Sequence, residues 1–368
     1  MTSRTRPGRT EHIDGVLVVG GGYAGLHAAS AAADAGADVT VLDPNGRHDF
    51  VTRLAAVAGG AAPRSDGSRE LGAFDHRVVI GSATHLADGE VILQDGTRLA
   101  ADAIVFCAGA GVTLPPIDGI EHALPLRTSE HAEAIRERLD PDGAVTVIGG
   151  GATGVQLAGA VSASRAASTV RIVEMESRLL PTMRPESSDG AARILRDRGV
   201  DVMVGATVDR IGADHVVVDG EELPGVAVWA GGFAPRTEGL DVELNGAGQI
   251  VVDEFLRISG MSRTFAAGDV AEHHTTDGDP LPMSAQVAVQ AGDAAGENAA
   301  RVAGGSEPEP ASLSHQGWVL DLSGQRGIAE IGGFSLSGPF ADLIPPFLHE
   351  AIDLKSLFGA GGFSALTF

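Results

Sequence analysis

Apolar residues near the start of the chain fall into short blocks separated by glycine-rich and alanine-rich stretches. Four apolar residues, Val16 to Val19, precede a run of glycines, and an alanine-rich stretch continues to Gly36. A second apolar block follows at Asp38 to Leu42. Short apolar blocks are typical of buried strands, and the longer stretch is typical of a helix. The order therefore predicts a strand, a helix and a second, parallel strand.

The same order of parts returns 129 residues later, measured from Gly20 to Gly149. We expect a strand at Ala144 to Ile148, a helix from near Thr153 and a strand at Thr169 to Val173. Internal repetition on this scale indicates two domains of similar construction in one chain. The alternation of strands and helices places both in the α/β class.

The similarity extends to a later part of each unit. Val91 to Gly109 is similar to Val216 to Gly231: each has a strand, an Asp-Gly pair and a buried apolar strand that ends in Ala-Gly. An Asp-Gly pair between strands favours a type I′ turn. We therefore expect a type I′ hairpin in each domain.

The last third of the chain is less regular. Thr264 to Ala267 predicts another short buried strand, and a long helix is expected from about Met283 to Arg301. The segment Gly304 to Ser312 has the composition of a linker. The apolar stretch ADLIPPFLHEAIDLKSLF at 341–358 is expected to dock on the first domain or on a second subunit.

These patterns predict the following division of the chain. It comprises a mobile tail at 1–14, a first domain at 15–112 and 249–303, a second domain at 113–248, and a small C-terminal docking unit at 312–368.

Charge and cysteine content narrow the range of functions. The formal net charge is −23, which disfavours nucleic acid and anionic lipid as partners. Cys107 is the single cysteine, so the chain holds neither a disulfide framework nor a redox-active cysteine pair. The arginines of the first fifteen residues precede no long apolar run, so we expect neither a signal peptide nor a membrane span and predict a cytoplasmic protein.

The glycines after the first strand carry the first candidate chemistry. In the GxGxxG pattern, Gly20 permits a tight turn, Gly22 lets a pyrophosphate approach the backbone, and Gly25 lets the helix pack closely on the sheet. Tyr23 and Ala24 open the helix, whose N-terminus favours phosphate. Asp43, at the end of the next strand, is placed to bind the hydroxyls of a ribose. The alternative is an ordinary glycine turn with an unrelated carboxylate.

The second repeat has the same parts in the loop Gly149, Gly151, Thr153 and Gly154, followed by Glu174. The two units are thus predicted to be Rossmann-like dinucleotide-binding domains. A carboxylate at the position of Glu174 accepts from a free 2′-hydroxyl and repels a 2′-phosphate, which favours NADH over NADPH. Arg171 and Arg178 lie nearby, and we interpret them as solvated strand-end residues.

The arrangement resembles the flavoprotein reductases that bind two dinucleotides on a glutathione-reductase-like fold. The resemblance covers about Val16 to Arg301. It implies that the first loop binds FAD and the second NAD(P)H. Thr264 to Ala271, TFAAGDVA, is similar to the second FAD motif of that family and implies contacts from Gly268 and Asp269. The alternative for Asp269 is an ordinary helix N-cap.

Within that family the two Ala-Gly strand ends are also expected to contact cofactor. They supply Ala108 and Gly109 on the FAD side and Gly231 on the NADH side. The pair His273-His274 is expected to lie in a solvated loop, and no metal site is predicted.

The most similar subfamily is that of the type II NADH:quinone oxidoreductases. The stretch AQVAVQ at 285–290 is similar to its AQxxxQ quinone motif, in which Gln286 and Gln290 share one helix face. The alternative is that both side chains lie on a solvated face. Gln156 stands where many relatives have a glutamate near the nicotinamide and flavin, so it keeps the hydrogen bonding and loses the charge.

The sequence therefore predicts an FAD-dependent enzyme that takes hydride from NADH and passes electrons to a quinone. Catalytic contacts are expected from Gln286, Gln290 and Gln156. Peripheral contact with the inner face of a membrane and a homodimer are both compatible with the pattern. Alternatives are an NAD(P)H reductase of a small iron–sulfur carrier and a redox-sensing flavoprotein similar to apoptosis-inducing factor.

Overall fold

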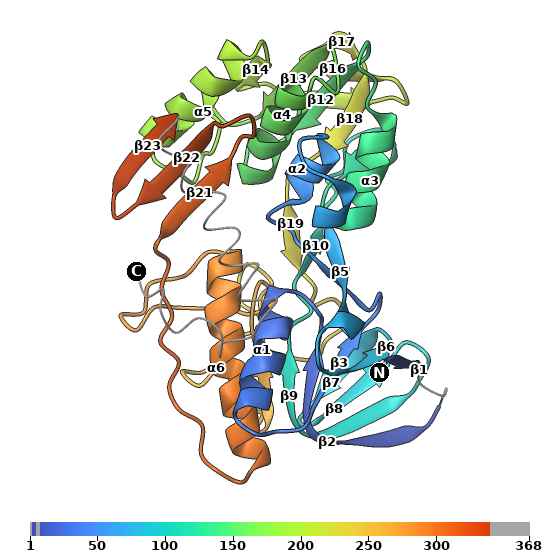
Figure 1. The fold of residues 1–368 in the computed structure, drawn as a ribbon, viewed down its shortest axis with the longest axis vertical. Coiled ribbons are helices and arrows are strands. Elements are labelled where there is room, and N and C mark those ends of the chain that lie inside the picture. Colours follow the sequence, from blue (N-terminus) through green and yellow to red (C-terminus); the bar gives the residue numbers. More distant parts are fainter. Residues whose placement is uncertain (1, 5–7, 339–368) are drawn as a thin grey trace.

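The computed structural model describes residues 2–4 and 8–338 and divides them into two halves, one above the other in Figure 1. The lower half contains α1, α6 and the largest sheet, and the upper half contains α4, α5 and a second sheet. The predicted α/β class with two similar sheets is confirmed. The helices are α1 (Tyr23–Asp34), α2 (Leu54–Ala58), α3 (Ser129–Arg138), α4 (Ala152–Ser164), α5 (Pro185–Asp197) and α6 (Ala285–Ala303).

The lower sheet places its five central parallel strands in the order β6-β3-β2-β9-β20, which is the order 3-2-1-4-5 of a Rossmann half. An antiparallel pair, β8 and β7, continues from β9, and β1 pairs with β6. Its strands are β1 (Thr2–Arg4), β2 (Thr10–Val19), β3 (Val39–Asp43), β6 (Arg77–Ile80), β7 (Ala83–Ala87), β8 (Glu90–Leu93), β9 (Arg98–Phe106) and β20 (Thr264–Ala266).

The upper sheet repeats this order as β14-β13-β12-β18, and β11 extends it beyond β18. A three-stranded antiparallel sheet, β15-β16-β17, accompanies it. The strands are β11 (Leu124–Pro125), β12 (Ala144–Ile148), β13 (Thr169–Glu174), β14 (Asp201–Val204), β15 (Val208–Ile211), β16 (His215–Val218), β17 (Glu221–Pro224) and β18 (Val226–Trp229).

Helices α1 and α6 lie side by side on the lower sheet (Figure 1). A Cβ atom on Gly292 of α6 would overlap the backbone of Ala24, and one on Gly296 would overlap that of Ala28. The two helix backbones therefore approach each other directly, and the first turn of α1 lies against Gly292 in the middle of α6.

The chain crosses between the halves on one antiparallel pair, β10 (Ala110–Val112) and β19 (Phe233–Pro235). This crossing differs from the predicted boundary at residue 248, because Leu240 and Val242 already pack with the lower half. A second difference involves α2. Its sequence position is in the first domain, but its apolar residues pack with the core of the upper half.

The N-terminal tail also differs from its predicted mobility. Strand β2 begins at Thr10 and pairs with β9 from Thr10 to Ile13, and Thr2 to Arg4 form the edge strand β1. In the first part of β2, Thr10 to Gly15, only Ile13 is buried, so these residues form no continuous apolar block. For this reason the sequence pattern predicted a strand only from Val16.

The two predicted hairpin turns have different geometries. At Asp219-Gly220 both residues have positive φ, 48° and 80°, as a type I′ turn requires. At Asp95-Gly96 only Gly96 has positive φ, and Leu93 N–H donates to Thr97 C=O across three loop residues. The type I′ prediction is therefore confirmed in the second domain and wrong in the first.

The C-terminal part forms a three-stranded antiparallel sheet, β21 (Gly317–Asp321), β22 (Gly327–Ile331) and β23 (Phe334–Gly338). This sheet packs on α4 and α5 of the upper half, with Leu320, Leu322 and Ile328 in that core. The apolar stretch at 341–358 lies outside the described residues.

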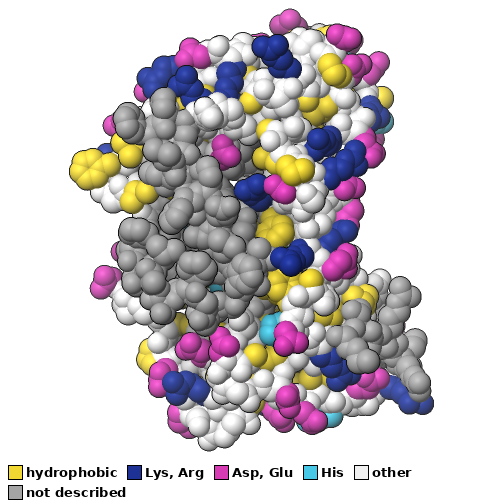
Figure 2. Space-filling model, in the orientation of Figure 1, with side chains coloured by type: hydrophobic (Ala, Val, Ile, Leu, Met, Phe, Trp, Pro, Cys, Tyr) yellow, Lys and Arg dark blue, Asp and Glu magenta, His cyan; other side chains and the backbone are white. Residues whose placement is uncertain are grey.

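A short strand pair and three 3₁₀ turns complete the described elements. Strands β4 (Arg47–Asp49) and β5 (Ser68–Glu70) pair antiparallel, and three 3₁₀ turns are η1 (Arg64–Asp66), η2 (Leu71–Ala73) and η3 (Ile120–His122). Acidic side chains are spread over the face shown in Figure 2, and basic ones lie among them.

Candidate functional site

The first glycine loop has a tight geometry that tolerates no side chain at two of its positions. Gly20 has φ of +107°, and its N–H donates to Leu42 C=O at 2.7 Å. A Cβ on Gly20 would overlap the carbonyl of Cys107, and one on Gly25 would overlap the carbonyl of Gly20. The roles predicted for Gly20 in the turn and Gly25 in helix packing follow from these contacts.

The second loop repeats this geometry closely. Gly149 has φ of +108°, and its N–H donates to Val173 C=O at 2.8 Å. A Cβ on Gly154 would overlap the carbonyl of Gly149. The Ala-Gly strand ends lie against the two loops: Ala108 N is 3.4 Å from a Cβ placed on Gly20, and Gly231 Cα is 2.7 Å from one on Gly149.

The third glycine of each loop, Gly22 or Gly151, has open space in front of it. A Cβ on either would meet no atom within 4 Å, although both have φ values that any residue can adopt. These residues are the N-caps of α1 and α4, and neither helix start has a side-chain cap. By contrast, Thr128 caps α3. Uncapped N–H groups beside open space fit a pyrophosphate.

The two acidic residues occupy matching positions beside the loops. Asp43 accepts the N–H of Gly21 at 2.9 Å, and Glu174 accepts that of Gly150 at 2.6 Å. Each is buried, with 8% of its surface exposed. Asp43 also accepts the N–H groups of Asn45 and Gly46, and Glu174 also accepts that of Glu176. Since each carboxylate oxygen has two lone pairs, one acceptor position remains on Asp43 and two remain on Glu174 for ribose hydroxyls. The site therefore suits an unphosphorylated adenosine ribose in both halves.

The arginines near Glu174 point elsewhere. Arg171 donates to the carbonyl of Pro224 at 3.0 Å, and Arg178 donates to the carbonyl of Pro181 at 2.7 Å. Both are partly exposed, and each is held by a backbone carbonyl. Neither has its guanidinium in a salt bridge with Glu174 in the described structure, and neither is aimed at a 2′-phosphate by these contacts.

The second predicted FAD motif lies where α1 and α6 meet. Gly268 has φ of +79°, and a Cβ on it would lie 2.8 Å from that of Ala24 and 3.8 Å from that of Ala288. Asp269 does not cap a helix, because the next described helix, α6, is capped by Ser284. Its carboxylate pairs with Arg127 at 2.7 Å, and both side chains are largely buried.

Arg127 and Arg236 are residues that the sequence pattern did not indicate. Arg127 also donates to Ala110 C=O at 3.3 Å and lies 4.6 Å from the ring centre of Phe233, so it links both crossover strands to Asp269. Burial and the neighbouring Arg127 lower the pKa of Arg236. Asp269 lies 142 residues from Arg127 in the sequence, so their ion pair leaves no local signal.

Two buried histidines lie against the same loops. His48 approaches Gly21 C=O at 2.8 Å, and burial lowers the pKa of His48 to about 4. His273 approaches the N–H of Gly268 at 3.1 Å, and burial lowers its pKa to about 4 as well. His273 is 5% exposed, so the expectation of a solvated loop is wrong for this residue. Both imidazoles are neutral at pH 7.

The two glutamines of the AQxxxQ motif are engaged by the chain itself. Gln290 Nε2 donates to Ser314 C=O at 2.9 Å and to Gln286 C=O at 3.1 Å. Gln286 Oε1 accepts the N–H of Gln316 at 2.9 Å. They therefore share a helix face as predicted, but that face is covered by residues 314–316 and is not simply solvated. Gln156 and Thr153 lie half-exposed in the first turns of α4.

Cys107 is buried at the end of β9, and burial raises its pKa to about 12. The thiol is therefore protonated at physiological pH and is not a nucleophile.

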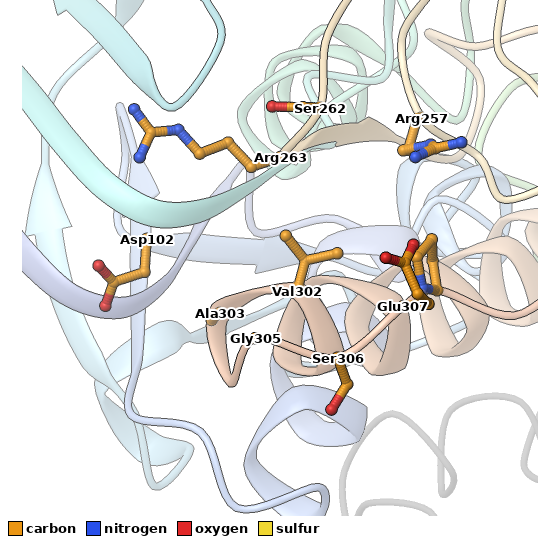
Figure 3. A pocket seen from close by; sticks show the side chains of 10 residues that line it. Asp102, Arg257, Ser262, Arg263, Val302, Ala303, Gly305, Ser306 and Glu307 are labelled. Carbon is orange, nitrogen blue, oxygen red and sulfur yellow. The ribbon is translucent and has the colours of Figure 1, made fainter.

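A separate hollow of about 510 Å³ lies at the C-terminal end of α6 (Figure 3). Asp102, Arg257, Arg263 and Glu307 line it, and Arg257 is paired with Asp253. Opposite charges balance there, and it contains neither of the glycine loops. No group of histidine, cysteine, aspartate and glutamate residues within the described chain could hold a metal ion.

Two Rossmann halves, each with an uncapped glycine loop and a buried acid, define an FAD-dependent NADH oxidoreductase. The chain belongs to the pyridine nucleotide-disulphide oxidoreductase family, whose model matches residues 14–292. The type II NADH:quinone oxidoreductase of Staphylococcus aureus is 25% identical over 94% of this chain and 96% of its own length.

Solved structures show the same fold. NDH2 from Plasmodium falciparum, solved in complex with NADH, superposes with a TM-score of 0.75 over 96% of each chain at 15% identity. A NAD-dependent persulfide reductase from A. fulgidus superposes with a TM-score of 0.74 at 27% identity, over 86% of this chain and 63% of its own.

Proposed function

We propose that this protein oxidises NADH with FAD and passes the electrons to a quinone. The observation that carries the proposal is the pair of loops with open third glycines, one in each half, with a buried acid beside each. The similarity to the Staphylococcus aureus enzyme extends over nearly the whole chain and supports a quinone as acceptor.

In this proposal the lower half binds FAD and the upper half binds NADH. Gly20, Gly22, Gly25, Asp43 and Asp269 hold FAD, and Gly149, Gly151, Gly154 and Glu174 hold NADH. When bound, FAD supplies a centre that takes a hydride from nicotinamide and releases electrons to an acceptor. The protein positions the two dinucleotides and supplies the fixed dipoles of the α1 and α4 N-termini.

Thiol chemistry is disfavoured by the only cysteine of the chain. Cys107 is buried and protonated, so it cannot form a persulfide or a mixed disulfide at an accessible site. The similarity to the persulfide reductase therefore supports the fold and the binding of nucleotides. It does not support a persulfide as the electron acceptor of this chain.

No helix within the described residues is both long enough and apolar enough to cross a membrane. We propose a cytoplasmic protein that meets its quinone by peripheral contact with the inner membrane face. A homodimer is compatible with this arrangement.

The function is tested by anaerobic titration of the purified protein. We expect a bound flavin spectrum, bleaching by NADH in preference to NADPH, and reoxidation by a short-chain ubiquinone. Glu174→Ala should weaken NADH binding by about tenfold and reduce the preference over NADPH, because the ribose acceptor is lost. Purified protein without flavin, or reduced flavin that quinone does not reoxidise, contradicts the proposal.

A further inference from the structure

The segment after α6 returns along that helix and is held by its amide side chains. We call residues 309–316 the strap. Asn298 Nδ2 donates to Glu309 C=O at 2.8 Å, and Asn298 Oδ1 accepts the N–H of Glu309 at 2.8 Å. Leu313 is buried in the lower core. The strap then ends at β21, which packs on the upper half.

Nearer the start of α6, the two glutamines bind the strap in the same way. Gln290 donates to Ser314 C=O at 2.9 Å and accepts the N–H of Ser314 at 3.0 Å. Gln286 accepts the N–H of Gln316 at 2.9 Å. Positions 286, 290 and 298 share one helix face, so the strap lies along a ladder of amide side chains.

The contact with the strap uses both N–H groups of the Gln290 side chain. The amide nitrogen of Gln290 has two hydrogens. One reaches Ser314 C=O and the other reaches Gln286 C=O at 3.1 Å. No donor of Gln290 remains for the carbonyl of an acceptor while the strap is in place. Ser314 C=O makes the very contact that a quinone carbonyl would make.

We propose that the strap is an internal competitor of the quinone: the acceptor's carbonyl reaches Gln290 by displacing the Ser314 peptide. The proposal rests on the proposed function, since it assumes a quinone at this face of α6. Because the strap joins the lower half to the sheet packed on the upper half, displacement couples acceptor entry to the position of β21.

Ser314→Pro tests the proposal without touching the glutamines. Proline lacks the N–H that Gln290 accepts, so the strap is held more weakly while both glutamine side chains remain. Stopped-flow reoxidation of the NADH-reduced protein by a short-chain ubiquinone gives an apparent dissociation constant. We expect it to fall roughly two- to tenfold, the range for one lost hydrogen bond. An unchanged or larger constant overturns the proposal.

Glu309→Pro is the matched control. It removes the N–H that the Asn298 side chain accepts, farther along α6 from the glutamines, together with the carboxylate that pairs with Arg301 at 2.9 Å. The apparent constant for quinone should equal that of the unchanged protein. Ser314→Ala keeps the peptide N–H but removes the hydroxyl that donates to Gln290 Oε1 at 3.3 Å, so it should lower the constant by less than Ser314→Pro does.

Hydrogen exchange of the unchanged protein decides the matter if Ser314→Pro does not fold. Saturating quinone should raise amide exchange at Ser314 and Gln316 and leave Glu309 unaffected. Exchange at Ser314 that stays constant or falls overturns the proposal. The proposed function fails separately, when quinone does not reoxidise the reduced flavin of the unchanged protein. Reoxidation without faster exchange rejects the strap proposal alone.

Discussion

Gly22 and Gly151 differ from the other loop glycines in having empty space where a side chain would be. The turn glycines fail to accept a Cβ because the chain's own carbonyls lie there, so replacing them disturbs folding. At Gly22 and Gly151 nothing of the protein is within 4 Å and φ is ordinary. At these two residues, binding can therefore be separated from folding.

Replacing Gly151 by valine should abolish NADH binding and leave the protein folded. The new side chain occupies the space proposed for the pyrophosphate, and the free energy of unfolding should fall by only about 1 kcal/mol, because Gly151 is the N-cap of α4 and valine is a poor N-cap residue. Gly22→Val should do the same to FAD. Equilibrium dialysis with each dinucleotide and urea unfolding measure the two effects. Gly246→Val, at an equally open glycine with no positive φ, is the control. Normal NADH affinity in Gly151→Val would place the nucleotide elsewhere.

The buried neutral histidines predict a loss of stability in mild acid. The pKa values of His48 and His273 are about 4 in the folded protein, against about 6.5 in an unfolded chain. The unfolded state therefore binds more protons below pH 6.5, and stability falls as the pH is lowered from 6.5 towards 4. Between pH 7 and pH 5 each histidine should contribute about 2 kcal/mol to the loss.

Urea unfolding at pH 7 and pH 5 measures this loss. His273→Asn should reduce the pH dependence by about the contribution of one histidine. A pH dependence that His273→Asn leaves intact would mean that His273 is not a source of it.

At the scale of elements, the sequence pattern predicted the helices and strands that are determined by neighbouring residues in the chain. Strand β12 and helix α6 follow from apolar blocks and helical spacing, and they occur close to their predicted positions. The packing of α2 on the upper half was not predictable, because five residues with a small apolar face suit either core. The engagement of Gln290 by Ser314 could not be foreseen either, since it depends on where the strap runs.

The contact between α1 and α6 gives a prediction for an element. Gly292→Ala would place a Cβ on the backbone of Ala24, so the helices must separate. We expect a loss of about 1–3 kcal/mol in the free energy of unfolding. FAD affinity should also fall, because Ala24 is in the first turn of α1 beside the glycine loop. Gly304→Ala, whose Cβ would make ordinary contacts at 3.4 Å and beyond, should change neither quantity. If Gly292→Ala had the same free energy of unfolding as the unchanged protein, the close approach of α1 and α6 would be contradicted.

At the scale of the whole molecule, long-range contacts join two halves that the chain order does not separate cleanly. The pair β10–β19 and the ion pair of Arg127 with Asp269 connect them near the proposed flavin site. The strap and β21 form a second connection, because the strap is bound to α6 of the lower half and β21 packs on α4 of the upper half. Domain boundaries predicted from composition assign consecutive residues to one domain. These contacts join residues that are far apart in the sequence, so composition does not predict them.

The net charge of −23 predicts which acceptors the reduced protein can serve. A neutral quinone feels no net attraction or repulsion, so its rate of reoxidation should be constant within about twofold from 20 mM to 500 mM NaCl. Ferricyanide and an acidic ferredoxin are repelled at low salt, and screening should raise their rates by roughly tenfold over that range. Stopped-flow measurement with NADH-reduced protein compares the three. A ferredoxin that reacts fastest at low salt would indicate a local basic docking patch that outweighs the net charge. That result would favour an iron–sulfur carrier over a quinone as the acceptor, because attraction at low salt requires complementary surfaces.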